Sequence, residues 1–244
     1  MTVLCIETST SVCSAAICTD GKPLKQCICL EGSNHARLLP LYIEELLQFA
    51  KEQHLAIDAV ALSEGPGSYT GLRIGTSTAK GLCYGLNVPL IPVPTLQVLC
   101  AAALEKLADS QWPTANSFLC PMIDARRMEV YTAFYDTDLH PLSEVKAVVV
   151  ESEDSLLSFS ANGQQLTANS QVWYFGDGAK KCEAVFTKPN WHYMPDIVPE
   201  SRHLATIVGP ILDNTNGQTV NIAYYEPYYL KEFIAAQSHV KGLK

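Results

Sequence analysis

The sequence predicts an α/β fold with two lobes, each built on a mixed sheet flanked by helices. Three observations support this prediction: the length, the composition, and the order of apolar segments along the chain. A chain of 244 residues suggests one or two domains and can bury a sizeable core without disulfides or a metal. Its apolar fraction of 48% against 17% charged residues excludes disorder as the dominant state.

The first hundred residues alternate between runs of strand length and amphipathic runs of helix length. Strands are expected at 3–7, 12–19, 23–30, 59–63 and 88–93, and helices at 36–53, 71–86 and 95–107. Asp20-Gly21 is typical of a tight hairpin turn, and Ser33-Asn34 and Thr95 are typical helix caps. The resulting order β-β-β-α-β-α-β-α predicts one sheet with an antiparallel and a parallel half. This order is typical of the ribonuclease-H-like half of an ASKHA fold, the fold of actin, hexokinase and Hsp70.

After residue 108 the pattern changes, because Pro113 interrupts a segment without helical periodicity. Further strands are expected at 118–123, 128–135, 145–150 and 172–176, and helices at 152–159, 179–186 and 201–212. The polar segment 160–170 is expected to be a surface loop. We therefore expect a ribonuclease-H-like lobe at 1–108, a smaller α/β lobe at 109–225, and an extended segment with a basic tail at 226–244.

The charge balance and the cysteines limit the classes of function. Seventeen Lys and Arg against 25 Asp and Glu give a net charge of −8, so the chain alone is expected to bind nucleic acid poorly. Nine cysteines without a Cys-x-x-Cys motif predict buried thiols in a reducing compartment. No signal peptide is visible, and Pro89, Pro92 and Pro94 interrupt the uncharged stretch 81–104, which predicts a cytoplasmic protein without a membrane span.

A glycine-rich run, Gly65 to Gly75, follows a predicted strand and leads into a predicted helix. In that setting, loop amides and a helix N-terminus can hold an anion. The run matches neither the Walker A motif nor the dinucleotide fingerprint. Two interpretations stay open: a phosphate cradle, or a structural turn capped by Ser68 or Thr70. The candidate anion or nucleotide residues are Thr8, Ser9, Gly65, Gly67, Ser68 and Thr70.

Two predicted helices carry more apolar or small residues than one core-facing stripe requires. Gly71, Gly75 and Gly85 fall on one face of the second helix together with Thr78 and Leu82. These glycines indicate close approach of another backbone, which is either this chain's own sheet or a partner helix. Leu38 and Leu41 lie outside the core stripe of the first helix, which favours a partner. The predicted partner-binding residues are Leu38, Leu41, Tyr42, Gly71, Ile74, Gly75, Thr78 and Leu82.

Catalytic motifs are scarce. The six histidines are scattered without metal-ligand spacing, so no metal site is expected. The run Phe175 to Ala179 is weak evidence for an adenosine-side loop. Asp124-Ala125-Arg126-Arg127 is compatible with anion binding and equally with an Arg–carboxylate pair that braces the lobes.

Several motifs in order resemble the TsaB (YeaZ) family, densely over the first hundred residues and more sparsely beyond. They are the glycine-rich run, Ile6-Glu7-Thr8-Ser9-Thr10, Leu38-Leu39-Pro40, Pro92-Val93-Pro94-Thr95-Leu96, Ile123-Asp124-Ala125-Arg126, Glu129-Val130-Tyr131, and Glu226-Pro227-Tyr228-Tyr229-Leu230-Lys231. Met128 departs from the pattern, which has glycine before Glu-Val-Tyr.

This resemblance implies an ASKHA fold and a non-catalytic role in making threonylcarbamoyladenosine in tRNA. In that system the paralogue TsaD carries the metal and the transfer chemistry, TsaB binds and activates TsaD, and the ATPase TsaE joins the pair. The helix 95–107, where TsaD would bear metal-binding histidines, has none here. The expected partners are therefore TsaD, TsaE and, without TsaD, a second copy of the chain, with tRNA reached only through the complex.

The same resemblance implies no tightly bound cofactor and leaves ATP or ADP at the complex interface open. The alternative hypothesis is an ASKHA small-molecule kinase or ATPase with Thr8, Ser9 and the loop at Gly176 and Gly178 on the nucleotide. A metalloprotease is a third class, for which neither a metal site nor a nucleophile triad can be assembled from the sequence.

Overall fold

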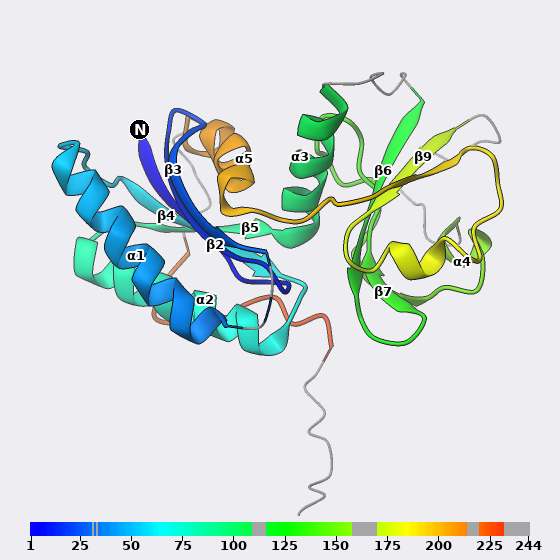
Figure 1. Cartoon of the computed structure of the whole chain (residues 1–244), viewed down its shortest axis with the longest axis horizontal. Coiled ribbons are helices and arrows are strands. Elements are labelled where there is room, and N and C mark those ends of the chain that lie inside the picture. Colours follow the sequence, from blue (N-terminus) through cyan, green and yellow to red (C-terminus); the bar gives the residue numbers. More distant parts are fainter. Residues whose placement is uncertain (31, 33, 109–115, 158–169, 214–219, 232–244) are drawn as a thin grey trace, which may run out of the picture.

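The computed structural model describes residues 1–30, 32, 34–108, 116–157, 170–213 and 220–231. Within these residues the strands form two five-stranded mixed sheets, one in each of two lobes that lie side by side (Figure 1). The predicted ASKHA-type α/β architecture is confirmed. The loop expected at 160–170 lies almost wholly outside the described residues, as do the tail beyond 231 and most of the segment around Pro113.

The first sheet has the strand order β3-β2-β1-β4-β5. Its strands are β1 (Thr2–Glu7), β2 (Cys13–Thr19), β3 (Lys22–Cys29), β4 (Ala59–Gly65) and β5 (Leu90–Pro94). β1, β2 and β3 pair antiparallel, whereas β4 runs parallel to both β1 and β5, as the element order predicts. The hairpin turns at Asp20 and Gly21, with φ of 50° and 75°, so the turn uses the left-handed region that this dipeptide tolerates.

Helices cover both faces of this sheet. α1 (His35–Glu52) and α2 (Tyr69–Leu86) pack on one face, where Leu39, Ile43 and Leu46 of α1 are buried against apolar strand residues. α3 (Thr95–Ala108) packs on the opposite face. Thr95, predicted as a helix cap, is the first residue of α3, and its Oγ1 accepts the Gly65 N–H at 3.1 Å and lies 2.7 Å from Ser63 Oγ.

The helix α5 (Ser201–Asp213) shows where the structure differs from the expected division of the chain. Leu204, Ala205 and Val208 are buried against the first sheet, although the sequence analysis placed 109–225 in the second lobe. His203 Nε2 lies 2.8 Å from Glu105 Oε2, which ties α5 to α3. The chain has therefore returned to the first lobe by residue 201. There α5 covers strands of the first sheet that α3 does not cover.

The second sheet has the order β10-β9-β6-β7-β8. Its strands are β6 (Ser117–Asp124), β7 (Glu129–Thr132), β8 (Lys146–Val149), β9 (Gln171–Phe175) and β10 (Trp191–Met194), with the short helix α4 (Asp154–Leu157) beside them. Two expectations were wrong. The segment 179–186 forms only the 3₁₀ turn η1 (Lys180–Cys182), and β10, which pairs parallel with β9, was not expected.

The segment 220–231 lies outside regular structure and joins the two lobes. Its Tyr228 N–H donates to Glu64 O of β4 at 2.8 Å, and Lys231 pairs with Glu129 of β7. A Cβ on Gly65 would lie 2.5 Å from Tyr228 O, so glycine is needed where this segment crosses β4. Figure 1 shows the segment passing beside α2 toward the second lobe.

All nine cysteines are free, and all but the half-buried Cys29 are buried, as the sequence predicts. Burial raises the pKa of the Cys83 thiol to about 11 and that of Cys120 to about 12, which keeps both thiols protonated at neutral pH. Among the helices of the described residues, none combines the length and apolar character required to cross a membrane.

Candidate partner-binding groove and interlobe cleft

The N-terminal half of α2 packs tightly against the turn that follows β1. A Cβ added to Gly71 would overlap Thr8 O, and one added to Gly75 would overlap Thr8 Oγ1. Thr8 Oγ1 also donates to Gly71 O at 2.9 Å. The prediction that these two buried glycines line an exposed partner-binding stripe is therefore corrected: they permit close packing inside the chain.

The same turn uses its own polar groups internally. Ser9 N–H and Ser9 Oγ–H both donate to Glu7 Oε1, at 2.6 and 2.5 Å, and Ser9 O accepts the Ser68 N–H at 2.6 Å. Glu7 is fully buried, and this burial raises the pKa of its carboxyl while the hydrogen bonds from Ser9 lower it. A Cβ on Gly67 would overlap Ser9 O. The glycine-rich run is thus a packed structural turn.

Ser68 is the N-cap of α2, and its Oγ accepts the Gly71 N–H at 3.3 Å. Of the two capping candidates, this confirms Ser68; Thr70 lies within the first turn of the helix.

A cleft of about 710 Å³ separates this turn from the second lobe. It is lined from the first lobe by Ser9, Gly67, Ser68 and Thr70, and from the second lobe by Asp124, Arg126, Tyr131 and Asp177. Tyr228, Tyr229 and Lys231 of the C-terminal segment complete the lining. The fold therefore brings four of the six predicted anion residues to one cleft. Thr8 and Gly65 do not line it.

The loop at Gly176 and Gly178 repeats the packing seen in the first lobe. A Cβ on Gly176 would overlap Met122 O, and Gly178 N–H donates to Met122 O at 3.0 Å. In both lobes, the glycine-rich turn after a strand lies against the end of the neighbouring parallel strand. This backbone contact accounts for both glycines of the predicted adenosine-side loop.

The outer face of the first lobe carries an open apolar groove of about 1150 Å³ between α1 and α2. Its lining includes Leu41, Leu47, Thr78 and Leu82 together with Gly81, Gly85 and Leu86. Leu41 is 54% exposed and Leu86 39%, and a Cβ on either glycine would meet nothing within 4 Å. Leu38 and Tyr42 of α1 and Ile74 of α2 are half-buried and do not line this groove; Ile74 lines the interlobe cleft.

Gly81 and Leu86 were not among the predicted partner-binding residues. The spacing of Gly81 four residues before Gly85 would have placed both on one face of α2. The groove is therefore shifted toward the C-terminal end of α2 relative to the predicted face.

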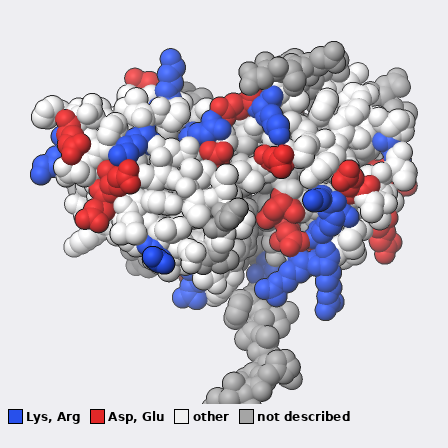
Figure 2. Space-filling view, in the orientation of Figure 1, with Lys and Arg blue, Asp and Glu red and all other residues white. Residues whose placement is uncertain are grey.

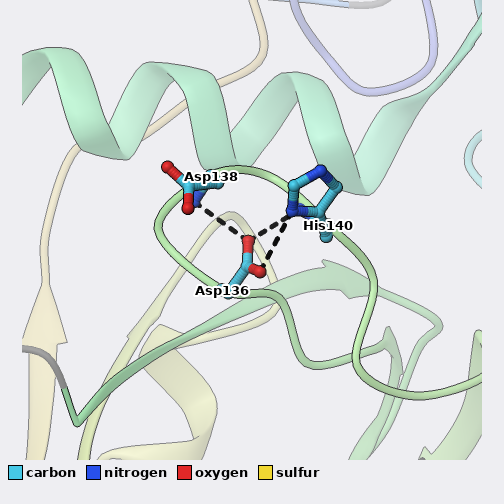
Figure 3. Close-up of side chains that lie close together, drawn as sticks. All are labelled: Asp136, Asp138 and His140. Atoms are coloured by element: carbon cyan, nitrogen blue, oxygen red, sulfur yellow. Dashed lines mark hydrogen bonds and ion pairs between the residues drawn. The ribbon is translucent and has the colours of Figure 1, made fainter.

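Asp136, Asp138 and His140 form a group on the loop after β7 whose ligand atoms lie within 4.8 Å of one another (Figure 3). The sequence analysis did not identify this group. Asp136 Oδ1 accepts the N–H groups of Asp138 and His140 at 2.9 and 2.8 Å, and Oδ2 lies 3.2 Å from His140 Nδ1. These bonds make Asp136 the cap of a turn, a common role for an exposed aspartate.

Comparisons with known proteins agree with this fold. The family model described as TsaD, tRNA N6-adenosine threonylcarbamoyltransferase, matches residues 30–229. The chain is 28% identical over 238 residues to the tRNA threonylcarbamoyladenosine biosynthesis protein TsaB of Escherichia coli K12, covering 96% of each chain. It is 35% identical over 131 residues to the protein of that name from Haemophilus influenzae, covering 54% and 52%.

YeaZ from Pseudomonas aeruginosa superimposes with a TM-score of 0.73 at 24% identity, covering 94% of this chain and 99% of that structure, and so has the same fold. Two lobes with mixed sheets and a cleft between them define an ASKHA-like α/β protein. The chain belongs to the family of the TsaD model and, within it, to the TsaB (YeaZ) family.

Proposed function

We propose that the chain is a non-catalytic subunit of the machinery that makes threonylcarbamoyladenosine in tRNA, and that it binds and activates a TsaD protein. The observation that carries the proposal is the groove between α1 and α2, where Leu41, Leu86 and two bare glycine positions leave apolar surface uncovered. A surface of this kind suits the apolar face of a partner helix. The names of the relatives support the pathway.

The non-catalytic role is supported by what the site residues do. The amide of Ser9 and that of Ser68 are engaged within the chain, and α3 contains no histidine. The partner would supply the metal and the transfer chemistry, with TsaE as a further component. When TsaD is absent, the same groove would pair two copies of the chain.

Leu41→Asp tests the groove, because it places a carboxylate at an exposed position of the groove lining, outside the buried core. We expect affinity for purified TsaD, measured by calorimetry, to fall about thirtyfold or more. The matched control is Leu24→Asp, since Leu24 is 49% exposed on β3 and lies outside the groove. Equal affinity of both variants and the unchanged chain would refute the groove as the binding surface.

The competing hypothesis is a nucleotide-dependent kinase or ATPase that uses the interlobe cleft. The cleft's size and hydroxyl lining keep this alternative worth testing. Calorimetry of the isolated chain with Mg-ATP separates the two hypotheses. Tight binding with turnover would favour the kinase, whereas weak binding together with normal activation of TsaD would favour the subunit.

A further inference from the structure

We infer that the turn between β6 and β7 is a phosphate-binding site for RNA, with Arg126 and Arg127 as its cations. The inference rests on the proposed function in one respect: tRNA is the nucleic acid that the complex would present to this turn.

The backbone of the turn is unusual for arginine. Arg126 and Arg127 have φ of 73° and 50°, the left-handed region that favours glycine and asparagine. Met128, at the position where the family pattern has glycine, is not among the residues of positive φ. The turn closes through the Ala125 N–H to Glu129 O at 3.0 Å, which any pair of residues could provide. Two adjacent arginines in this conformation therefore point to a role outside the turn.

The charges around the turn leave both guanidinium groups unneutralised. Asp124 pairs with Lys181, and Glu129 pairs with Lys231. Among the described residues, Arg126 and Arg127 form no ion pair, and both are exposed. The lobe-bracing Arg–carboxylate pair, one of the two alternatives from the sequence, is thus absent there. Asp177 adds a negative charge at the cleft, yet its Oδ1 is turned to the Asp124 N–H at 3.0 Å.

The position of the turn suits a long polyanion better than a small nucleotide. Arg126 lines the interlobe cleft, and so do Tyr131 and Tyr228, of which Tyr228 is 42% exposed. Figure 2 shows Lys and Arg side chains gathered at the lower edge of the second lobe, with Asp and Glu side chains above them. Exposed guanidinium groups suit the phosphates of RNA, and exposed aromatic rings suit its bases. A terminal nucleotide phosphate would instead need the loop amides that the chain already engages.

The test compares the unchanged chain with Arg126→Asn/Arg127→Gly, which removes both cations and fits the left-handed backbone. The control, Lys22→Ala/Lys188→Ala, removes the same charge far from the turn in the sequence. Anisotropy of a labelled tRNA transcript is titrated with each chain, alone at low salt and in complex with TsaD. We expect about tenfold weaker binding and a salt slope reduced by about one to two, with the control within about twofold.

Unchanged tRNA affinity of the arginine variant would overturn the inference, as would loss of Mg-ATP binding with tRNA binding retained. The two proposals fail separately. If the chain does not bind TsaD, the proposed function fails, and the titration of the isolated chain still decides the role of the arginines. If the variant binds TsaD and tRNA normally, only the inference about the turn fails.

Discussion

The two halves of α2 use glycine for opposite purposes. In the N-terminal half, Gly71 and Gly75 are buried, and a Cβ on either would overlap Thr8. In the C-terminal half, Gly81 and Gly85 face open space. A helical glycine costs about 1 kcal/mol relative to alanine in both halves. Close packing within the chain offsets that cost in the first half, while nothing within the described chain offsets it in the second.

The largest expected effect on stability comes from adding a methyl group to the packed N-terminal half of α2. Gly71→Ala forces a methyl group onto the Thr8 carbonyl, which is backbone and cannot move aside. We expect a loss of about 2–3 kcal/mol in the free energy of unfolding and a Tm lower by roughly 5–10 °C. Thermal unfolding followed by circular dichroism measures both. Ser77→Ala, an exposed change in the same helix, is the control, and an equal Tm for the two variants would contradict the packing account.

Glu7→Gln tests the turn after β1, against which the N-terminal half of α2 packs. Burial raises the pKa of Glu7 in the folded state above its value in the unfolded chain. The folded state therefore holds the proton more tightly, and stability falls as pH rises from the unfolded pKa through the raised folded pKa. We expect denaturant unfolding to show this fall in the unchanged chain and a smaller one in the variant. Parallel pH profiles would contradict the assignment.

Ser68→Ala removes the cap at the packed end of α2. The Gly71 N–H then loses its acceptor, and we expect about 1 kcal/mol of destabilisation. Thr70→Ala, at an exposed position without a capping bond in the described structure, should change stability by only a few tenths of a kcal/mol. Denaturant melts of the two variants side by side distinguish them, and a reversed order would place the cap at Thr70.

Gly85→Ala should change the free energy of unfolding least, and it should stabilise the fold where the preceding variants destabilise it. Because its Cβ meets nothing, the alanine should stabilise the chain by up to about 1 kcal/mol, raising Tm by roughly 2–4 °C. If the groove binds a partner helix, the same methyl group should weaken TsaD binding. A lower Tm would mean that this half of α2 is also packed against the chain.

Much of the fold could be predicted because it depends on local patterns. The Asp20-Gly21 turn, the buried strands of the first lobe and the length of α1 follow from turn chemistry and periodicity. The second lobe was predicted less well. Its strands β7, β8 and β10 span four residues each, and 179–186 has helix-forming residues but makes only one 3₁₀ turn. Such short elements depend on their sheet neighbours, which are distant in sequence.

Some features of the candidate sites could likewise be predicted from the sequence, and others could not. Residue types and spacing were enough to predict the glycine-rich turn and the exposed Leu41. They could not assign Gly71 and Gly75 to the inside and Gly85 to the outside, because at 100° per residue all three fall on one face of the helix. That assignment depends on where the turn at Thr8 lies in space. The unpaired state of Arg126 and Arg127 likewise depends on Lys181 and Lys231, which reach Asp124 and Glu129 only in the folded chain.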